Sequence, residues 1–301
     1  MGSALTTIGL PVALGIIMFG LGLSLTPGDF ARVVKQPKAV IIALLCQLIL
    51  LPAICFGLVL LFQLPPILAV GMMMLAASPG GTTANLYSHL FRGDVALNIS
   101  LTAVNSVIAV VTLPIITNLA IAYFNPFDDQ LGLQWSKALE VFAIVLLPVA
   151  LGMVVRHLWP KFAKAMDKPV RIASIIILIV VIAGAVASNW DLLIANFGRL
   201  AAITIVFCVI SLAVGYWAPR VFQVGKRQSI ASSFEIGIHN ATLAIVIAQS
   251  VLGSTELSLP AAVYGVLMFF IAFGFGFLIR ERKTTDAAAE PEPEETTSAT
   301  T

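Results

Sequence analysis

The fold is decided by two stretches of sequence, Ala77-Ser78-Pro79-Gly80-Gly81-Thr82-Thr83-Ala84-Asn85 and Ser232-Ser233-Phe234-Glu235-Ile236-Gly237-Ile238-His239-Asn240-Ala241-Thr242, each inside an apolar run. In the first stretch, a proline and two glycines stop a helix, and the threonines after them can begin another. In the second, a carboxylate, a glycine, an imidazole and an amide fall within six residues. Both stretches predict helices that are interrupted inside an apolar environment.

The composition of the whole chain indicates what that environment is. The 301 residues are 59% hydrophobic and only 11% charged, with a mean hydropathy of +1.01. Soluble domains contain about 25% charged residues, so the composition predicts a polytopic membrane protein that is all α-helical. The net charge of +2 comes without a basic cluster, which disfavours a nucleic-acid partner. The sequence indicates membrane lipid around the protein and no protein partner.

A helix needs about 20 apolar residues to cross the hydrocarbon core of a bilayer. Nine stretches meet this length, roughly 4–25, 39–62, 66–91, 95–123, 136–158, 170–188, 197–218, 227–253 and 258–279. If the N-terminus is outside, fifteen of the 17 basic residues fall on the cytoplasmic side, and only Lys137 and Arg199 do not. The positive-inside rule therefore favours nine spans in the cell inner (plasma) membrane, with the C-terminus cytoplasmic.

The two interrupted spans are the third and the eighth, which stand at related places in the two halves of the chain. Two inverted five-helix repeats that lack one leading helix would give nine spans, arranged 4+5. The transmembrane domain would then cover 1–283, with a first repeat over about 1–125 and a second over 135–283. A polar tail over 284–301 is expected to be disordered. Paired interrupted helices near the midplane are typical of transporter binding sites.

Glu235 is the one acidic residue expected deep inside a span. A carboxylate at that depth costs at least about 2.5 kcal/mol and normally has a partner or an ion. His239 lies one turn later on the same face, and it can be that partner, an ion ligand or a proton acceptor. A purely structural, hydrogen-bonded role for His239 also stays open.

Other polar residues inside the spans point to the same kind of site. Singly, each is more often a helix–helix hydrogen-bonding residue than a ligand. Together they supply neutral oxygen donors and one carboxylate, which is the chemistry that a desolvated Na⁺ requires. One carboxylate shared between two Na⁺ ions would make each ion favour binding of the other. The set consists of Gln47, Asn85, Asn98, Thr102 and Glu235.

Four ordered motifs now make the chain similar to bacterial members of the bile acid:sodium symporter family over residues 8–280. They are Met18–Leu25 followed by Asp29-Phe30, Ser78–Thr82 through Asn85, Arg92–Leu97, and Glu235–Asn240. The resemblance implies a panel domain and a core domain whose two discontinuous helices cross behind a substrate cavity. It implies Na⁺ as the coupling ion, at two sites that meet at the carboxylate of span eight.

The resemblance also implies which residues form these sites. One Na⁺ site would use Asn85, Asn98, Thr102 and Glu235; the other would use Gln47, Glu235 and the backbone carbonyls near Ile236 and Ile238, with His239 beside them. The substrate would meet Thr82, Asn85 and Asn240. The chain departs from the family twice. Ala84 replaces a frequent serine, and His239 replaces a frequent glutamine, although imidazole is softer than the ligands Na⁺ prefers.

The function expected from these observations is secondary active import of a small organic anion, driven by Na⁺ through alternating access. The last span is apolar through Val266–Phe270, whereas bile acid carriers of the similar family tend to be more polar there, which disfavours a bile acid. The resemblance implies a smaller monocarboxylate, such as pantothenate or a 2-keto acid. Coupling to H⁺ through Glu235 and His239 is the alternative. An intramembrane enzyme is disfavoured, because neither a Ser–His dyad motif nor an HExxH motif occurs. A sensor is disfavoured because the short tail offers no output domain.

Overall fold

The computed structural model describes residues 9–125 and 135–281, and every regular element within them is helical, which confirms the expected all-α class. Short 3₁₀ segments (η2, Val33–Lys35; η5, Glu256–Ser258) and π-helical segments (η3, Cys46–Leu50; η4, Ile247–Val251) join or extend the α-helices. The α-helices are α2 Leu10–Ser24, α3 Pro27–Arg32, α4 Pro37–Leu45, α5 Leu51–Leu61, α6 Pro66–Ala77, α7 Thr82–Leu90, α8 Val95–Phe124, α9 Trp135–Leu158, α10 Pro160–Ser188, α11 Trp190–Val221, α12 Lys226–Gly237, α13 Ala241–Val246 and α14 Leu259–Ile279.

Not every helix is long enough to cross a membrane unaided. Among the described residues, five helices are long and apolar enough, namely Pro37–Leu61, Val95–Phe124, Pro160–Ser188, Trp190–Val221 and Glu256–Ile279. A sixth results if Leu10–Ser24 and Pro27–Lys35, bent by 66°, count as one span. Helices α6 and α7, and α12 and α13, are too short singly because each pair is interrupted. The count of nine crossings therefore stays a prediction.

The connections that carry basic residues differ from the short loops expected of them. Helix α10 begins at Pro160, so Lys161, Lys164 and Lys168 lie on a helix that extends ahead of the apolar stretch. Proline is favoured in the first turn of a helix, which explains this early start. The expected disordered tail over 284–301 lies outside the described residues.

The broken helices lie in the interior of the protein. Helix α6 is buried from Leu68 to Ala77 and helix α12 from Ser229 to Gly237. The outermost helices expose large apolar side chains instead, such as Phe270 at 74% and Leu278 at 81%. A chain with apolar side chains on its outside and polar, interrupted helices inside matches a lipid environment, in which free backbone groups must be enclosed by protein.

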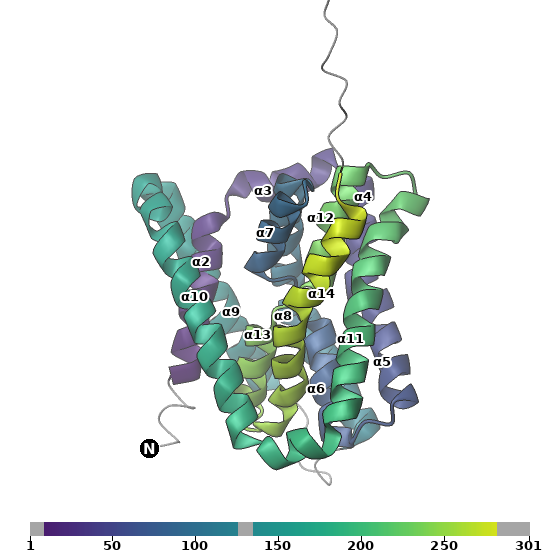
Figure 1. The fold of residues 1–301 in the computed structure, drawn as a ribbon. Coiled ribbons are helices and arrows are strands. Elements are labelled where there is room, and N and C mark those ends of the chain that lie inside the picture. The colour runs from purple at the N-terminus through teal and green to yellow at the C-terminus, as the bar shows by residue number, and fades with distance from the viewer. Residues whose placement is uncertain (1–8, 126–134, 282–301) are drawn as a thin grey trace, which may run out of the picture.

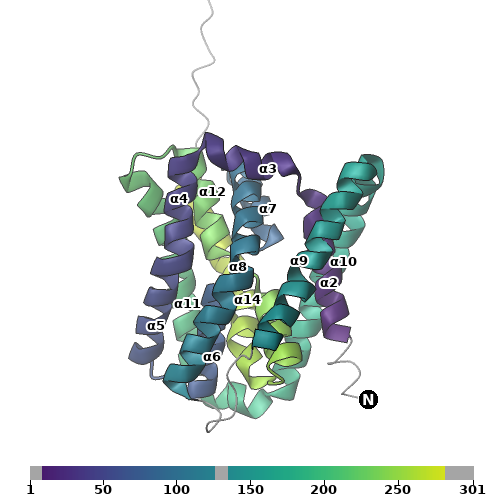
Figure 2. The ribbon, with the colours of Figure 1, turned by 180° about the vertical axis from the view of Figure 1, so that it is seen from behind.

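Helices α2, α9 and α10 pack together as a three-helix group at one side of the molecule, and Figures 1 and 2 show this group from both faces. Glycines allow the close approach of α2 and α9, because a Cβ atom added at Gly22 would overlap the Val149 carbonyl group. Gly152 meets the backbone of α2 in the same way. The Arg156 guanidinium then donates to Leu23 O at 2.9 Å. The remaining long helices form the main group.

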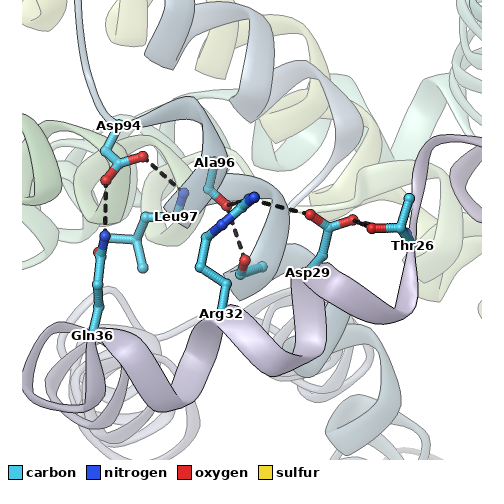
Figure 3. A network of polar contacts seen from close by, with 8 residues as sticks. Thr26, Asp29, Arg32, Gln36, Asp94, Ala96 and Leu97 are labelled. Atoms are coloured by element: carbon cyan, nitrogen blue, oxygen red, sulfur yellow. Dashed lines mark hydrogen bonds and ion pairs between the residues drawn. The ribbon is translucent and has the colours of Figure 1, made fainter.

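Helix α3 leaves the three-helix group and is attached to the main group by the network drawn in Figure 3. Asp29 closes a capping box with Thr26 at the start of α3. The Arg32 guanidinium lies 3.2 Å from Asp29 Oδ1 and also reaches the first turn of α8. Gln36 Nε2 donates to Asp94 Oδ2 at 3.2 Å, and Asp94 caps α8. The bend between α2 and α3 is therefore the place where the chain passes from one group to the other.

Candidate functional site

The two interruptions of the helices pair with each other through their backbones. Gly80 and His239 form an isolated antiparallel bridge. On one side of it, the Gly81 N–H donates to Ile238 O at 2.9 Å. On the other side, the Asn240 N–H donates to Pro79 O at 2.8 Å. The interruptions thus satisfy backbone groups that neither broken helix could satisfy alone.

The two broken pairs run in opposite directions through the molecule. In Figure 1, α6 lies low and α7 high, whereas α12 lies high and α13 low. The first turns of α7 and α13 therefore both begin at the paired backbone, where the positive ends of the two helix dipoles meet. We call this paired segment, Ser78–Gly81 with Ile238–Asn240, the crossover.

Glu235 lies directly against the crossover and is fully buried. The Thr102 hydroxyl is 2.5 Å from Glu235 Oε2, and Asn105 Nδ2 donates to Glu235 Oε1 at 3.2 Å. A Cβ atom added at Gly80 would overlap the Glu235 carboxyl group, so only glycine allows this approach. Within residues 9–125 and 135–281, no ion pair reaches Glu235.

One face of α8 contributes polar groups to this carboxylate. Asn98, Thr102 and Asn105 follow one another at spacings of four and three residues, which places them on one side of a helix. Asn98 Nδ2 donates to Ala231 O, one turn before Glu235, at 2.7 Å. The Oδ1 atoms of Asn98 and Asn105 are buried and accept no hydrogen bond within the described part of the chain. A buried acceptor left without a partner costs about 1–3 kcal/mol, which a bound cation would offset.

Gln47 and His239, the latter within the crossover itself, meet at the carbonyl oxygen of Ser78. Segment η3 holds Gln47, whose Nε2 donates to Ser78 O at 2.9 Å. His239 Nδ1 lies 3.2 Å from the same oxygen. Because a carbonyl only accepts, Nδ1 carries the proton, and in a neutral imidazole Nε2 is then an acceptor. His239 Nε2 and Gln47 Oε1 are both buried without a partner among the described residues.

The ring of His239 is also held by aromatic side chains. Phe207 stacks on it with ring centroids 5.5 Å apart and planes at 17°, and Tyr264 meets it edge-on at 5.4 Å. The Tyr264 hydroxyl donates to Gly237 O at 2.8 Å, just before the interruption. The structural role that the sequence left open for His239 is therefore present, together with a free lone pair.

An open cleft lies between the three-helix group and the crossover. Thr82 and Asn240, both expected to meet the substrate, line it, and so does His239. Asn85 does not line it, and its expected contact with the substrate stays a prediction. The three-helix group contributes an almost wholly apolar wall made of Ile17, Met18, Leu21, Ser174, Ile175 and Leu178.

The other predicted ligands make fewer direct contacts with the Glu235 carboxylate. Asn85 is on the first turn of α7, and its Oδ1 is buried and lacks a partner within the described residues. Ile236 and Ile238 are fully buried beside Glu235, and Ile238 O already accepts from the crossover. Asn105, which the resemblance places in neither ion site, contacts Glu235 directly. Its seven-residue spacing from Asn98 was the signal in the sequence that could have found it.

Comparison with known proteins bears on what these groups do. The profile of the Sodium Bile acid symporter family matches residues 11–196, more than half of the chain. A probable sodium/metabolite cotransporter of rice chloroplasts is 28% identical, covering 85% of this chain but only 60% of the rice protein, less than two thirds of its length. An uncharacterized sodium-dependent transporter of Bacillus subtilis is 26% identical over 85% of this chain and 78% of its own length.

The human ileal sodium/bile acid cotransporter is 25% identical over 91% of this chain and 79% of its own length. The names of these relatives make Na⁺ the coupling ion of the family. The membrane character of the helices, the paired interruptions and the matched profile agree with one another. This chain belongs to the sodium bile acid symporter family.

Proposed function

We propose that this protein is a Na⁺-coupled symporter of a small organic monoanion. The observation that carries the proposal is Glu235, a fully buried carboxylate without a basic partner among the described residues. Around it are amide oxygens that accept no hydrogen bond from the residues that the structure describes. Hard oxygen ligands and one carboxylate suit a small alkali cation, and the family supplies the coupling ion.

Two Na⁺ ions would share this carboxylate. The first would be held by Asn85, Asn98, Thr102 and Glu235. The second would be held by Gln47, Glu235 and His239, with the carbonyl groups of Ile236 and Ile238. Two monovalent cations beside one carboxylate leave a net positive charge under the crossover, and that charge favours an anion in the adjoining cleft.

The lining of the cleft supports a monocarboxylate with a compact apolar body. At the crossover, the first turn of α7 with Thr82, and the side chain of Asn240, offer polar groups to one carboxylate. Among the described residues that line the cleft there is no Asp, Glu, Lys or Arg, and the one titratable side chain is His239, so a second carboxylate would lack a permanent counter-ion there. The apolar wall of the three-helix group would cover the hydrocarbon part of a molecule such as a 2-keto acid or pantothenate.

Transport would proceed by alternating access, with nine crossings arranged as a 4+5 inverted repeat. The three-helix group would act as the panel and the main group as the core, rocking about the cleft between them. The opposite directions of the two broken pairs in Figure 1 support this inversion. The contacts of Arg92 with Glu281 O, and of Arg227 with the Glu281 carboxylate, place basic connections at one end, which we assign to the cytoplasm.

Coupling to H⁺ is the second candidate, and His239 gives it a specific basis. Its Nε2 lone pair is free within the described residues, and it stands four residues after Glu235. A proton could then replace one of the two cations. This candidate predicts uptake that survives removal of Na⁺ and follows pH.

The test is thermal unfolding of the purified full-length protein in Na⁺ against K⁺ between pH 5.5 and 8.5, for wild type and Glu235→Ala. A ligand that binds only the folded state at 100 times its Kd stabilises it by about 2.7 kcal/mol, so wild type should be more stable in Na⁺. Glu235→Ala should lose that difference. Thr117→Ala, another buried polar residue on α8 and about 22 Å along the helix from Thr102, is the control and should keep it.

Na⁺-specific stabilisation that persists in Glu235→Ala contradicts the ion assignment. Stability that ignores Na⁺ and follows pH only when Glu235 is present would place H⁺ coupling first. Uptake of monocarboxylates against dicarboxylates into proteoliposomes, with an inward Na⁺ gradient, then tests the anion class.

A further inference from the structure

The carbonyl oxygen of the Asn105 side chain is buried beside a carboxylate, where no donor satisfies it. Asn105 is 1% exposed, and its Nδ2 atom donates to Glu235 Oε1 at 3.2 Å. Its Oδ1 atom accepts no hydrogen bond from the described residues. Oδ1 belongs to the same amide group that contacts the carboxylate. A buried acceptor oxygen without a partner is costly, and a cation bound at Glu235 would offset that cost.

Polar residues of α8 differ in this respect, because Asn98 Oδ1 and Thr117 Oγ1 also lack a partner among the described residues, whereas two serines near Asn105 have one. The Ser106 hydroxyl donates to Thr102 O at 2.7 Å, and the Ser100 hydroxyl donates to Ala96 O at 2.9 Å. Both side chains are satisfied within the helix itself. Asn105 instead reaches across to α12, where its amide contacts the buried Glu235 carboxylate and its Oδ1 has no partner among the described residues.

We propose that Asn105 Oδ1 is a direct ligand of the cation that Glu235 binds, in addition to Asn85, Asn98 and Thr102. This inference rests on the proposed Na⁺-coupled function. The two ends of the Asn105 amide group then have different roles. Its NH₂ group orients the Glu235 carboxylate, and its carbonyl oxygen completes the coordination of the ion. A Na⁺ ion gains a hard oxygen ligand where the chain has Ala84 on the facing helix α7, which offers no side-chain oxygen.

The experiment is a titration of thermal stability with Na⁺ and separately with Li⁺, at constant ionic strength with K⁺, on the full-length protein. For Asn105→Ala, the Na⁺ concentration for half-maximal stabilisation should rise about tenfold or more, since metal affinity falls by this much even when only a supporting partner is lost. Ser106→Ala is the matched control, one residue away and equally buried, and its half-maximal concentration should stay within about twofold of wild type.

The Li⁺ titration separates a ligand from a positioning residue. Cation selectivity depends on the number of ligands and the size of the cavity, so loss of a ligand should change the ratio of the Li⁺ and Na⁺ half-maximal concentrations. If Asn105 only orients Glu235, both concentrations rise by one factor, and the ligand assignment is overturned. Unchanged Na⁺ affinity in Asn105→Ala overturns the inference altogether.

A second variant protects the test against misfolding. Asn105→Leu fills a similar volume without a polar atom, and replacing buried polar groups by apolar ones of the same shape is often tolerated in folding. It should lose Na⁺ affinity at least as strongly as Asn105→Ala. If Glu235→Ala abolishes Na⁺ stabilisation and both Asn105 variants keep it, this inference fails while the proposed function stands. If Glu235→Ala keeps it too, the proposed function itself fails.

Discussion

The two sides of Glu235 are built in different ways. On the side of α8, Asn98, Thr102 and Asn105 project from one uninterrupted stretch of regular helix. On the side of the crossover, Gln47 comes from a π-helical segment and His239 from a helix interruption. The first set comes from consecutive turns of one helix, whereas Gln47 and His239 come from separate elements that meet at Ser78 O.

This difference predicts that the two ion sites are coupled to the anion to different degrees. A site formed on a regular helix is preorganised and costs little to occupy. A site formed by irregular backbone exists only while the crossover is intact, and the residues beside it line the cleft. Ion binding on the crossover side should therefore depend strongly on anion binding in the cleft. Ion binding on the α8 side should depend on the anion less.

The largest effect is expected from Gly80→Ala, because this substitution acts on both sides at once. The added Cβ atom overlaps the Glu235 carboxyl and backbone, which cannot both move away inside a packed interior. Overpacking of this kind costs about 1–3 kcal/mol or more, so the melting temperature should fall and Na⁺ stabilisation should vanish. Gly184→Ala on α10, where a Cβ atom meets open space, should leave Na⁺ stabilisation unchanged and should not lower the melting temperature, since alanine favours a helix more than glycine does. Normal Na⁺ stabilisation in Gly80→Ala would mean that the crossover is not needed for either ion.

Thr102→Val tests the α8 side alone, since it keeps the shape of the side chain and removes the hydroxyl 2.5 Å from Glu235 Oε2. A hydrogen bond to a charged group contributes about 1.5–3 kcal/mol, so Na⁺ affinity should fall by roughly ten- to a hundredfold. The measurement is the Na⁺ titration of thermal stability. Thr204→Val, a buried threonine that bonds to its own helix at Leu200 O, is the control. If the two variants have the same Na⁺ affinity, Thr102 is not part of the ion site.

His239→Gln tests the crossover side, and the smallest change is expected from it. An amide oxygen is a harder ligand than imidazole, so the second site should bind Na⁺ more tightly. The Na⁺ concentration for half-maximal uptake should then fall by about a few-fold. Uptake into proteoliposomes at several pH values measures it, with the exposed His157→Gln as the control. Loss of uptake at every pH would show that His239 has a function beyond ion binding, and loss of pH dependence alone would favour H⁺ coupling.

The sequence already contained much of the candidate site, but not in equal measure on its two sides. Asn98, Thr102 and Glu235 stand out as polar residues in apolar helices, and helical spacing alone places Asn98 and Thr102 on one face. Asn105 has the same spacing, yet its contact with Glu235 depends on how closely α8 and α12 pack. The sharing of Ser78 O by Gln47 and His239 could not be foreseen, since no local pattern encodes it.

The sequence by itself determined the membrane class, the all-helical fold and the two points where helices are interrupted. These follow from composition and from proline and glycine, which act on the backbone within a turn of their own position. The tertiary structure decided that the interruptions pair with each other, that α3 is attached to the main group, and that a cleft lies between an apolar wall and a polar crossover. Such features join residues more than fifty positions apart, and only the packing of whole helices brings them together.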